Sequence, residues 1–118
     1  MVQDIEQTII WPAILKCSGD DELIYIASEE KWHDEEGLHL ARYHETDVLI
    51  DSSGAVFSLL SKQGKHINPE FLDKRMSLED VLELVKAHAA QQASCCVAKL
   101  FAPTIHEALT IVELFGEE

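Results

Sequence analysis

The chain has 118 residues, of which 47% are hydrophobic and 26% are charged, and its formal net charge is −13. This length fits one domain of residues 1–118, and the apolar fraction excludes an intrinsically disordered chain. A chain this acidic is not expected to bind nucleic acid directly, because phosphate recognition needs clustered lysine and arginine.

Cellular location and cofactors are constrained by what the sequence does not contain. Residues 1–7 are polar, so we expect them to be frayed rather than a secretory signal. No apolar run reaches the length of a membrane span, and no glycine-rich phosphate loop or other cofactor motif occurs. Three cysteines, of which Cys95 and Cys96 are adjacent, form no disulfide framework. We therefore expect a cytoplasmic protein without a cofactor or a membrane partner.

The first two predicted elements are strands. The apolar run 9–17 predicts a strand that starts after Pro12 or lies at a sheet edge, because proline cannot donate to a neighbouring strand. Residues 22–27 are rich in β-branched and aromatic side chains and predict a second strand. The turn composition of residues 18–21 joins the two strands into an antiparallel hairpin.

A helix and a second hairpin follow. Ser28 predicts the N-cap of a helix that ends near Gly37, with glutamates in its first turn. Residues 38–44 fit either a strand or more helix, and the sequence leaves the choice open. The runs 48–51 and 55–60 flank a Ser-Ser-Gly turn and predict the clearest hairpin of the chain.

The C-terminal half predicts a long connection, a strand and two helices. Residues 61–76 are polar and predict a loop, in which Asn-Pro-Glu at 68–70 could open one helical turn. Apolar residues spaced along 78–89 form one stripe, which indicates an amphipathic helix. Residues 95–101 predict a strand, and a capping box at Thr104 begins a last helix that ends at Gly116.

The predicted order of elements is therefore β-β-α-β-β-α-β-α. This order is typical of an α+β fold, with a mostly antiparallel sheet of about five strands and the helices on one face. Parts of the first half also resemble a known family in three segments, WPAILK (11–16), GDDELIY (19–25) and LIDSSG (49–54). The resemblance is to a family of short gamma-proteobacterial proteins that carry a domain of unknown function. It implies a bacterial cytosolic origin and no particular activity.

Negative charge is concentrated between residues 20 and 51, where eleven acidic residues face only Lys31 and Arg42. Residues 62–75 carry a small positive excess instead. This asymmetry favours a non-enzymatic module that binds a basic protein, with association weakened by salt. The predicted interface is the first helix, with Trp32 as an anchor if it is exposed, or as a core residue if it is buried. The predicted acidic rim consists of Glu29, Glu30, Asp34, Glu35 and Glu36.

A metal-dependent or Cys/His enzyme is the alternative. His33, His39 and His44 lie beside several carboxylates and are the candidate metal ligands, although their spacing does not place them on one helical face. Cys95 or Cys96 could also act as a nucleophile with His66, His88 or His106 as its base, but this needs a hydrogen-bond distance that the sequence cannot test. A third hypothesis is self-association through a sheet edge, either the strand after Pro12 or the strand at Cys95. The sequence leaves the oligomeric state open.

Overall fold

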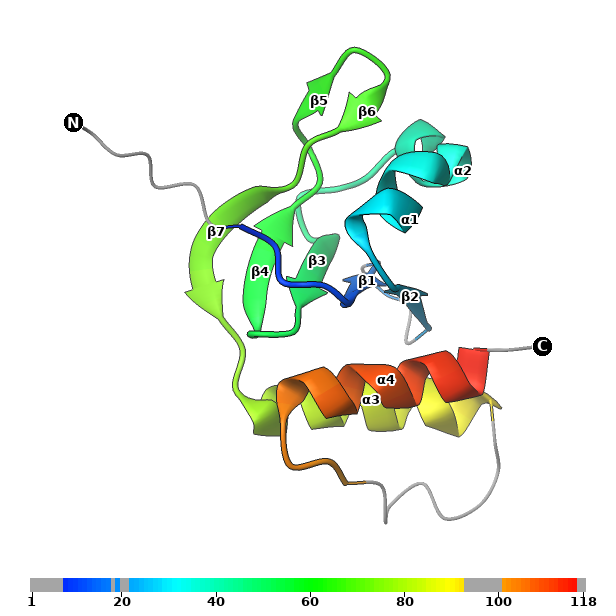
Figure 1. Cartoon of the computed structure of the whole chain (residues 1–118), viewed down its shortest axis with the longest axis vertical. Helices are drawn as coiled ribbons and strands as arrows, with labels where there is room; N and C mark the ends of the chain where they lie inside the picture. Colours follow the sequence, from blue (N-terminus) through cyan, green and yellow to red (C-terminus); the bar gives the residue numbers. More distant parts are fainter. Residues whose placement is uncertain (1–7, 18, 20–21, 93–100, 117–118) are drawn as a thin grey trace.

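The computed structural model describes residues 8–17, 19, 22–92 and 101–116. Its main sheet is antiparallel and has five strands in the order β2-β1-β3-β4-β7 (Figure 1), which confirms the α+β class. A two-stranded sheet pairs β5 with β6. The strands are β1 (Ala13–Lys16), β2 (Leu23–Ile26), β3 (Val48–Asp51), β4 (Ala55–Ser58), β5 (Lys62–Gln63), β6 (His66–Ile67) and β7 (Glu70–Arg75). The helices are α1 (Glu29–Asp34), α2 (Glu36–Leu40), α3 (Leu78–Gln92) and α4 (Ile105–Gly116).

Helices lie on both faces of the sheet, so the prediction that they cover one face is wrong. The helices α3 and α4 run side by side under one face, whereas α1 and α2 lie on the other side (Figure 1). Alternate residues of one strand point to opposite faces, and each face has its own core. Ile14 belongs to the core with α3 and α4, and Leu15 belongs to the core with Trp32. The central strands read as continuous apolar runs because both of their faces are buried.

The fifth strand of the sheet is β7, which lies in the segment predicted to be a loop. The predicted helical turn at residues 68–70 is also wrong, because Glu70 begins β7. This strand lies at the sheet edge and most of its side chains are exposed, so it lacks the apolar alternation that identifies a strand. Of the strand predicted at 95–101, residues 95–100 lie outside the described residues, and Phe101 is not in a strand.

The first helical region is broken into two short helices. The predicted helix ends at Asp34, where Glu35 adopts an extended conformation and caps α1 through its main chain. Gly37 lies inside α2 and is not the stop that we predicted. The ambiguous segment 38–44 continues α2 to Leu40 and has no strand. The predicted N-cap at Ser28 is confirmed, since its hydroxyl accepts a hydrogen bond from the Lys31 N–H at 3.2 Å.

Both predicted hairpins are confirmed, and the β3–β4 turn is held by the carboxylate of Asp51. This side chain is fully buried. Its Oδ1 accepts from the main-chain N–H groups of Ser53 (2.9 Å) and Ala55 (3.0 Å) and from the Ser53 hydroxyl (2.7 Å). Its Oδ2 accepts from the Ile10 N–H at 2.9 Å. Asp51 thus fixes the turn and ties the segment before β1 to it.

Gly54 connects this turn to the start of α3. Its φ of +88° lies in the region that favours glycine. Its carbonyl oxygen accepts from the Met76 N–H at 2.8 Å. A Cβ at this position would collide with the Met76 carbonyl oxygen and would lie 3.1 Å from a methyl carbon of Ile105. The backbone here therefore has no room for a side chain.

We expect Gly54→Ala to lower the free energy of unfolding by about 2–4 kcal/mol, through strain at positive φ together with the collision. Gly64→Ala is the matched control, because Gly64 also has a positive φ of +61° but a Cβ there meets open space. The control should cost only about 1 kcal/mol. Urea denaturation of both variants measures the difference, and equal losses would contradict the close packing at Gly54.

Candidate functional site

A groove of about 590 Å³ runs along the outer side of β2. We call it the β2 groove. The strand β2 is the last strand of the sheet, so on one side it pairs with β1 and on the other it borders the groove. The lining residues are Glu22, Leu23, Ile24, Tyr25, Ile26, Ala27, Lys31, Glu35, Leu38, Val112 and Glu113.

The groove exists because helices from both layers pack near the same edge strand. Val112 of α4 is buried in the core on one face, and Leu38 of α2 packs against the core on the other. In Figure 1, β2 lies between α1 on one side and α4 on the other. The two helical layers therefore form walls, and the edge of β2 forms the floor.

The floor of the groove is apolar and its rim is acidic. Ile24 is 43% exposed, although it is a large aliphatic side chain. The rim carries the carboxylates of Glu22, Glu35 and Glu113 against the single ammonium of Lys31, a balance of three negative charges against one positive. Burial, and secondarily the Glu113 carboxylate, raises the pKa of Tyr25, so its phenol stays protonated at neutral pH. This combination suits an apolar ligand that also carries positive charge.

The beginning of β2 is fixed by a buried histidine of α3. The Leu23 N–H donates to Nδ1 of His88 at 2.9 Å, and His88 is only 1% exposed. Because Nδ1 accepts, the ring proton of neutral His88 is on Nε2. Within the described residues, that Nε2 has no hydrogen-bond partner. The histidine therefore holds β2 against α3 in its neutral form.

Burial lowers the pKa of His88 below its usual 6.5, and the Glu22 carboxylate offsets this only in part. Between the lowered pKa and 6.5, the unfolded chain binds a proton that the folded chain does not. The contribution of His88 is therefore complete above pH 6.5 and is lost as pH falls through the folded-state pKa.

We expect the free energy of unfolding to fall between pH 7.5 and 5.5 by more in the wild type than in His88→Asn. One proton accounts for at most about 1.4 kcal/mol per pH unit. Asparagine keeps an acceptor near the Leu23 N–H but does not titrate. The other histidines are present in both proteins, so chemical denaturation at the two pH values isolates His88. Parallel pH dependence of the two proteins would contradict this role.

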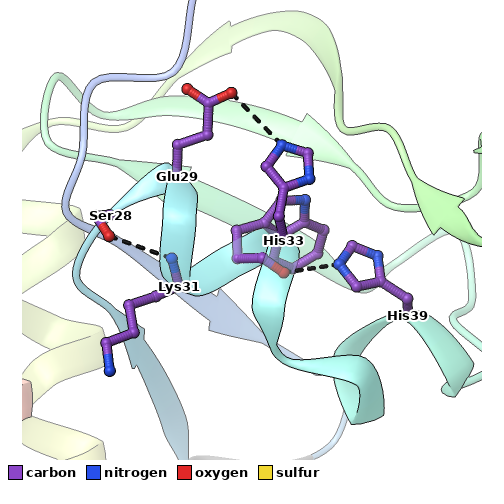
Figure 2. Close-up of polar contacts among 6 residues, drawn as sticks. Ser28, Glu29, Lys31, His33 and His39 are labelled. Atoms are coloured by element: carbon purple, nitrogen blue, oxygen red, sulfur yellow. Dashed lines mark hydrogen bonds and ion pairs between the residues drawn. The ribbon is translucent and has the colours of Figure 1, made fainter.

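The predicted metal ligands do not converge on a common point. Both ring nitrogens of His39 are already used: Nε2 donates to the Trp32 carbonyl oxygen at 2.7 Å, and Nδ1 accepts from the Ile67 N–H at 2.9 Å. His33 is on α1 and pairs with Glu29 at 3.5 Å (Figure 2). In the part of the chain that the structure describes, no three His, Cys, Asp or Glu side chains are placed to hold a metal ion. The metal hypothesis for His33, His39 and His44 therefore has no geometric support.

A different set of aromatic rings gathers where α1, α2 and β6 meet. The ring of His66 packs edge-on against those of His39, at a centroid distance of 4.7 Å, and His33, at 5.6 Å. The Trp32 ring packs against His39 at 4.7 Å. His44 is not part of this group, and its main-chain N–H donates to Asp47. These contacts attach the two short helices to the β5–β6 hairpin.

Trp32 is only 2% exposed, so its predicted role as an exposed anchor is wrong. It belongs to the core between α1 and the sheet, which is the alternative that the sequence left open. Trp32 lies on the side of α1 that packs against the sheet, and it is the one buried residue of that helix. The predicted rim residues are all exposed: Glu29, Glu30, Asp34, Glu35 and Glu36. Of these, only Glu35 lines the β2 groove.

Sequence reasoning missed most of the groove. Tyr25 and Glu113 are 88 positions apart, and nothing in the sequence predicts that α4 passes beside β2. One signal was available in the run Leu-Ile-Tyr-Ile of β2. Four consecutive apolar residues in an edge strand leave part of that strand uncovered, and this marks a candidate contact surface.

The fold and the groove together define an acidic α+β domain with a helix-flanked sheet edge. The chain belongs to the family DUF4144, described as a protein structure with unknown function, and the family match spans residues 11–112. A solved NMR structure of a protein from Shewanella amazonensis is similar, with a TM-score of 0.68 and 24% identity. The superposition covers 99% of this chain and 98% of the Shewanella chain, so the two proteins share the fold over nearly their whole lengths.

The search of curated proteins finds none that matches this chain. The family and the structural neighbour confirm the resemblance to a bacterial family of unknown function, and they assign no activity. Among the helices described in the structure, none combines the length and apolarity needed to cross a lipid bilayer.

Proposed function

We propose that this protein is a non-catalytic module that binds a basic segment of another cytoplasmic protein in the β2 groove. The observation that carries the proposal is the groove itself, which combines an exposed apolar strand edge with an acidic rim. Apolar contact supplies affinity at such a site, and the charges on the rim select the partner.

The exposed carboxylates of α1 and α2 extend the acidic surface beyond the groove. Glu29, Glu30, Asp34 and Glu36 contact solvent on helices next to the groove wall, and the whole chain carries a net charge of −13. The negative electrostatic potential of this surface speeds the encounter with a basic partner and repels acidic ones. The four carboxylates therefore serve in steering, whereas Glu35 and Glu113 contact the bound segment.

The lining of the groove favours binding over catalysis. Its titratable side chains are three glutamates, one tyrosine and one lysine, and no histidine or cysteine is among the described residues that line it. Among the described lining residues there is also no serine or threonine, so the pairing of a hydroxyl or thiol nucleophile with a histidine base does not occur there. The groove offers shape, apolar area and charge, which are the requirements of recognition.

Affinity capture from a lysate of a bacterium that encodes the protein tests this function. We expect the wild type to retain a basic protein in stoichiometric amount and to release it as salt rises. The double variant Glu35→Lys/Glu113→Lys should bind that protein at least about tenfold more weakly, which corresponds to about 1.4 kcal/mol.

The matched control is Glu45→Lys/Glu83→Lys, which changes the net charge by the same amount at exposed positions outside the groove. This control should retain most of the affinity. Equal loss in both double variants would mean that net charge alone drives capture, and equal retention would place the binding site elsewhere. Either result would contradict the groove as the binding site.

A further inference from the structure

We infer that the partner binds by strand addition: an extended, basic segment pairs its main chain with β2 and becomes a sixth strand of the sheet. This inference rests on the proposed function and specifies how the groove would work. A partner that binds through an edge strand gains affinity from main-chain hydrogen bonds and specificity from alternating side chains.

The phase of β2 shows which of its main-chain groups face the groove. In an antiparallel pair, residues alternate between those that bond to the neighbouring strand and those that point away from it. Leu23 pairs with Lys16 of β1, yet its N–H donates to His88 instead. The main-chain N–H and C=O of Leu23 therefore point away from β1. The same holds for Tyr25, because it lies two residues further along the strand. The N–H and C=O of Tyr25 thus point into the groove.

Only one edge of the sheet is suited to this pairing. At the other edge, β7 shifts register against β4, and Asp73 has a φ of +60° within it. Irregularity of this kind, together with exposed charged side chains, is how proteins block an edge strand. The strand β2 is regular over four consecutive pairs with β1, and all four of its residues are apolar. It has neither feature, and of its outward N–H groups that of Leu23 is bound by His88, so an added strand would pair from Tyr25 onward.

Both walls of the groove offer the same kind of side chains, namely an apolar residue and a glutamate. Tyr25 packs on the face of α4, beside Val112 and Glu113. Ile24 alternates with Tyr25 and so faces the other wall, beside Leu38 and Glu35. An added strand would therefore meet an apolar contact and a carboxylate on each of its faces. This arrangement selects a segment with apolar residues interspersed with lysine or arginine on both faces.

A second copy of the chain is a poor occupant on the same grounds. Pairing β2 with β2 of another copy would bring two acidic rims together, each with three carboxylates against one lysine. Like charges held close to one another across an interface cost several kcal/mol. Each copy also carries a net charge of −13. Charge complementarity therefore favours a basic segment of a different protein.

Selection of linear 12-residue peptides displayed on phage tests the mode of binding, with counter-selection against Glu35→Lys/Glu113→Lys. We expect selected peptides to be rich in lysine or arginine and in β-branched residues. The best peptide is then synthesised in two N-methylated series, one on odd and one on even positions. Only one edge of an added strand bonds to β2, so one series should lose at least about tenfold in affinity and the other about threefold or less.

Amide hydrogen exchange supplies a second readout that does not depend on the peptide chemistry. Exchange of the Tyr25 N–H should slow at least about tenfold in the presence of saturating unmethylated peptide, whereas that of Phe71 in β7 should not change.

Equal affinity of the two methylated series, or unchanged exchange at Tyr25, would overturn strand addition. Binding would then occur in the groove without pairing, and the proposed function would stand. Failure to select any peptide that depends on Glu35 and Glu113 would overturn the strand-addition inference, whereas the lysate capture decides the proposed function separately.

Discussion

The structure depends on one constraint, which is that the central strands β1, β3 and β4 must be buried on both faces. Ile14 and Leu15 are neighbours in β1, yet each is almost inaccessible and each belongs to a different core. Burial of one such side chain contributes roughly 1.5–3 kcal/mol, so neither face can be left open to water. The chain therefore needs a helical layer on each side, and α3–α4 and α1–α2 provide them. Because both layers approach the edge at β2, a groove forms there as a consequence of the packing.

Buried polar side chains fix the parts that apolar packing alone leaves undefined. Asp51 organises the β3–β4 turn, and His39 ties α1 and α2 to β6 through two main-chain groups. His88 does the same for β2 and α3. Each of these side chains binds main-chain groups that would otherwise be buried without a partner, which costs about 1–3 kcal/mol per group. Two of them are histidines, of which His39 was a candidate metal ligand in the sequence, and both connect elements through hydrogen bonds to main-chain groups.

Local signals in the sequence predicted the hairpins β1–β2 and β3–β4, the caps at Ser28 and Thr104, and the two long helices, because turns and caps depend on adjacent residues. The same signals failed for β7, where exposure removes the alternation, and for the distribution of helices between the faces. Trp32 shows the limit most directly, since its acidic neighbours indicate a surface and its helical position decides that it is buried. Of the predicted site residues only Glu35 lines the groove, and the apolar run of β2 was the one further signal, because the groove joins residues that are distant along the chain.

The central claim is that a partner segment lies along β2 and pairs with its main chain. NMR spectroscopy of the complex with the captured basic protein tests it most directly, through nuclear Overhauser contacts between main-chain protons of the two chains. We predict contacts from the partner's Hα and amide protons to those of Tyr25 and Ala27, in the regular pattern of adjacent strands. Contacts confined to side chains of the acidic helices, with none to the main chain of β2, would contradict the claim.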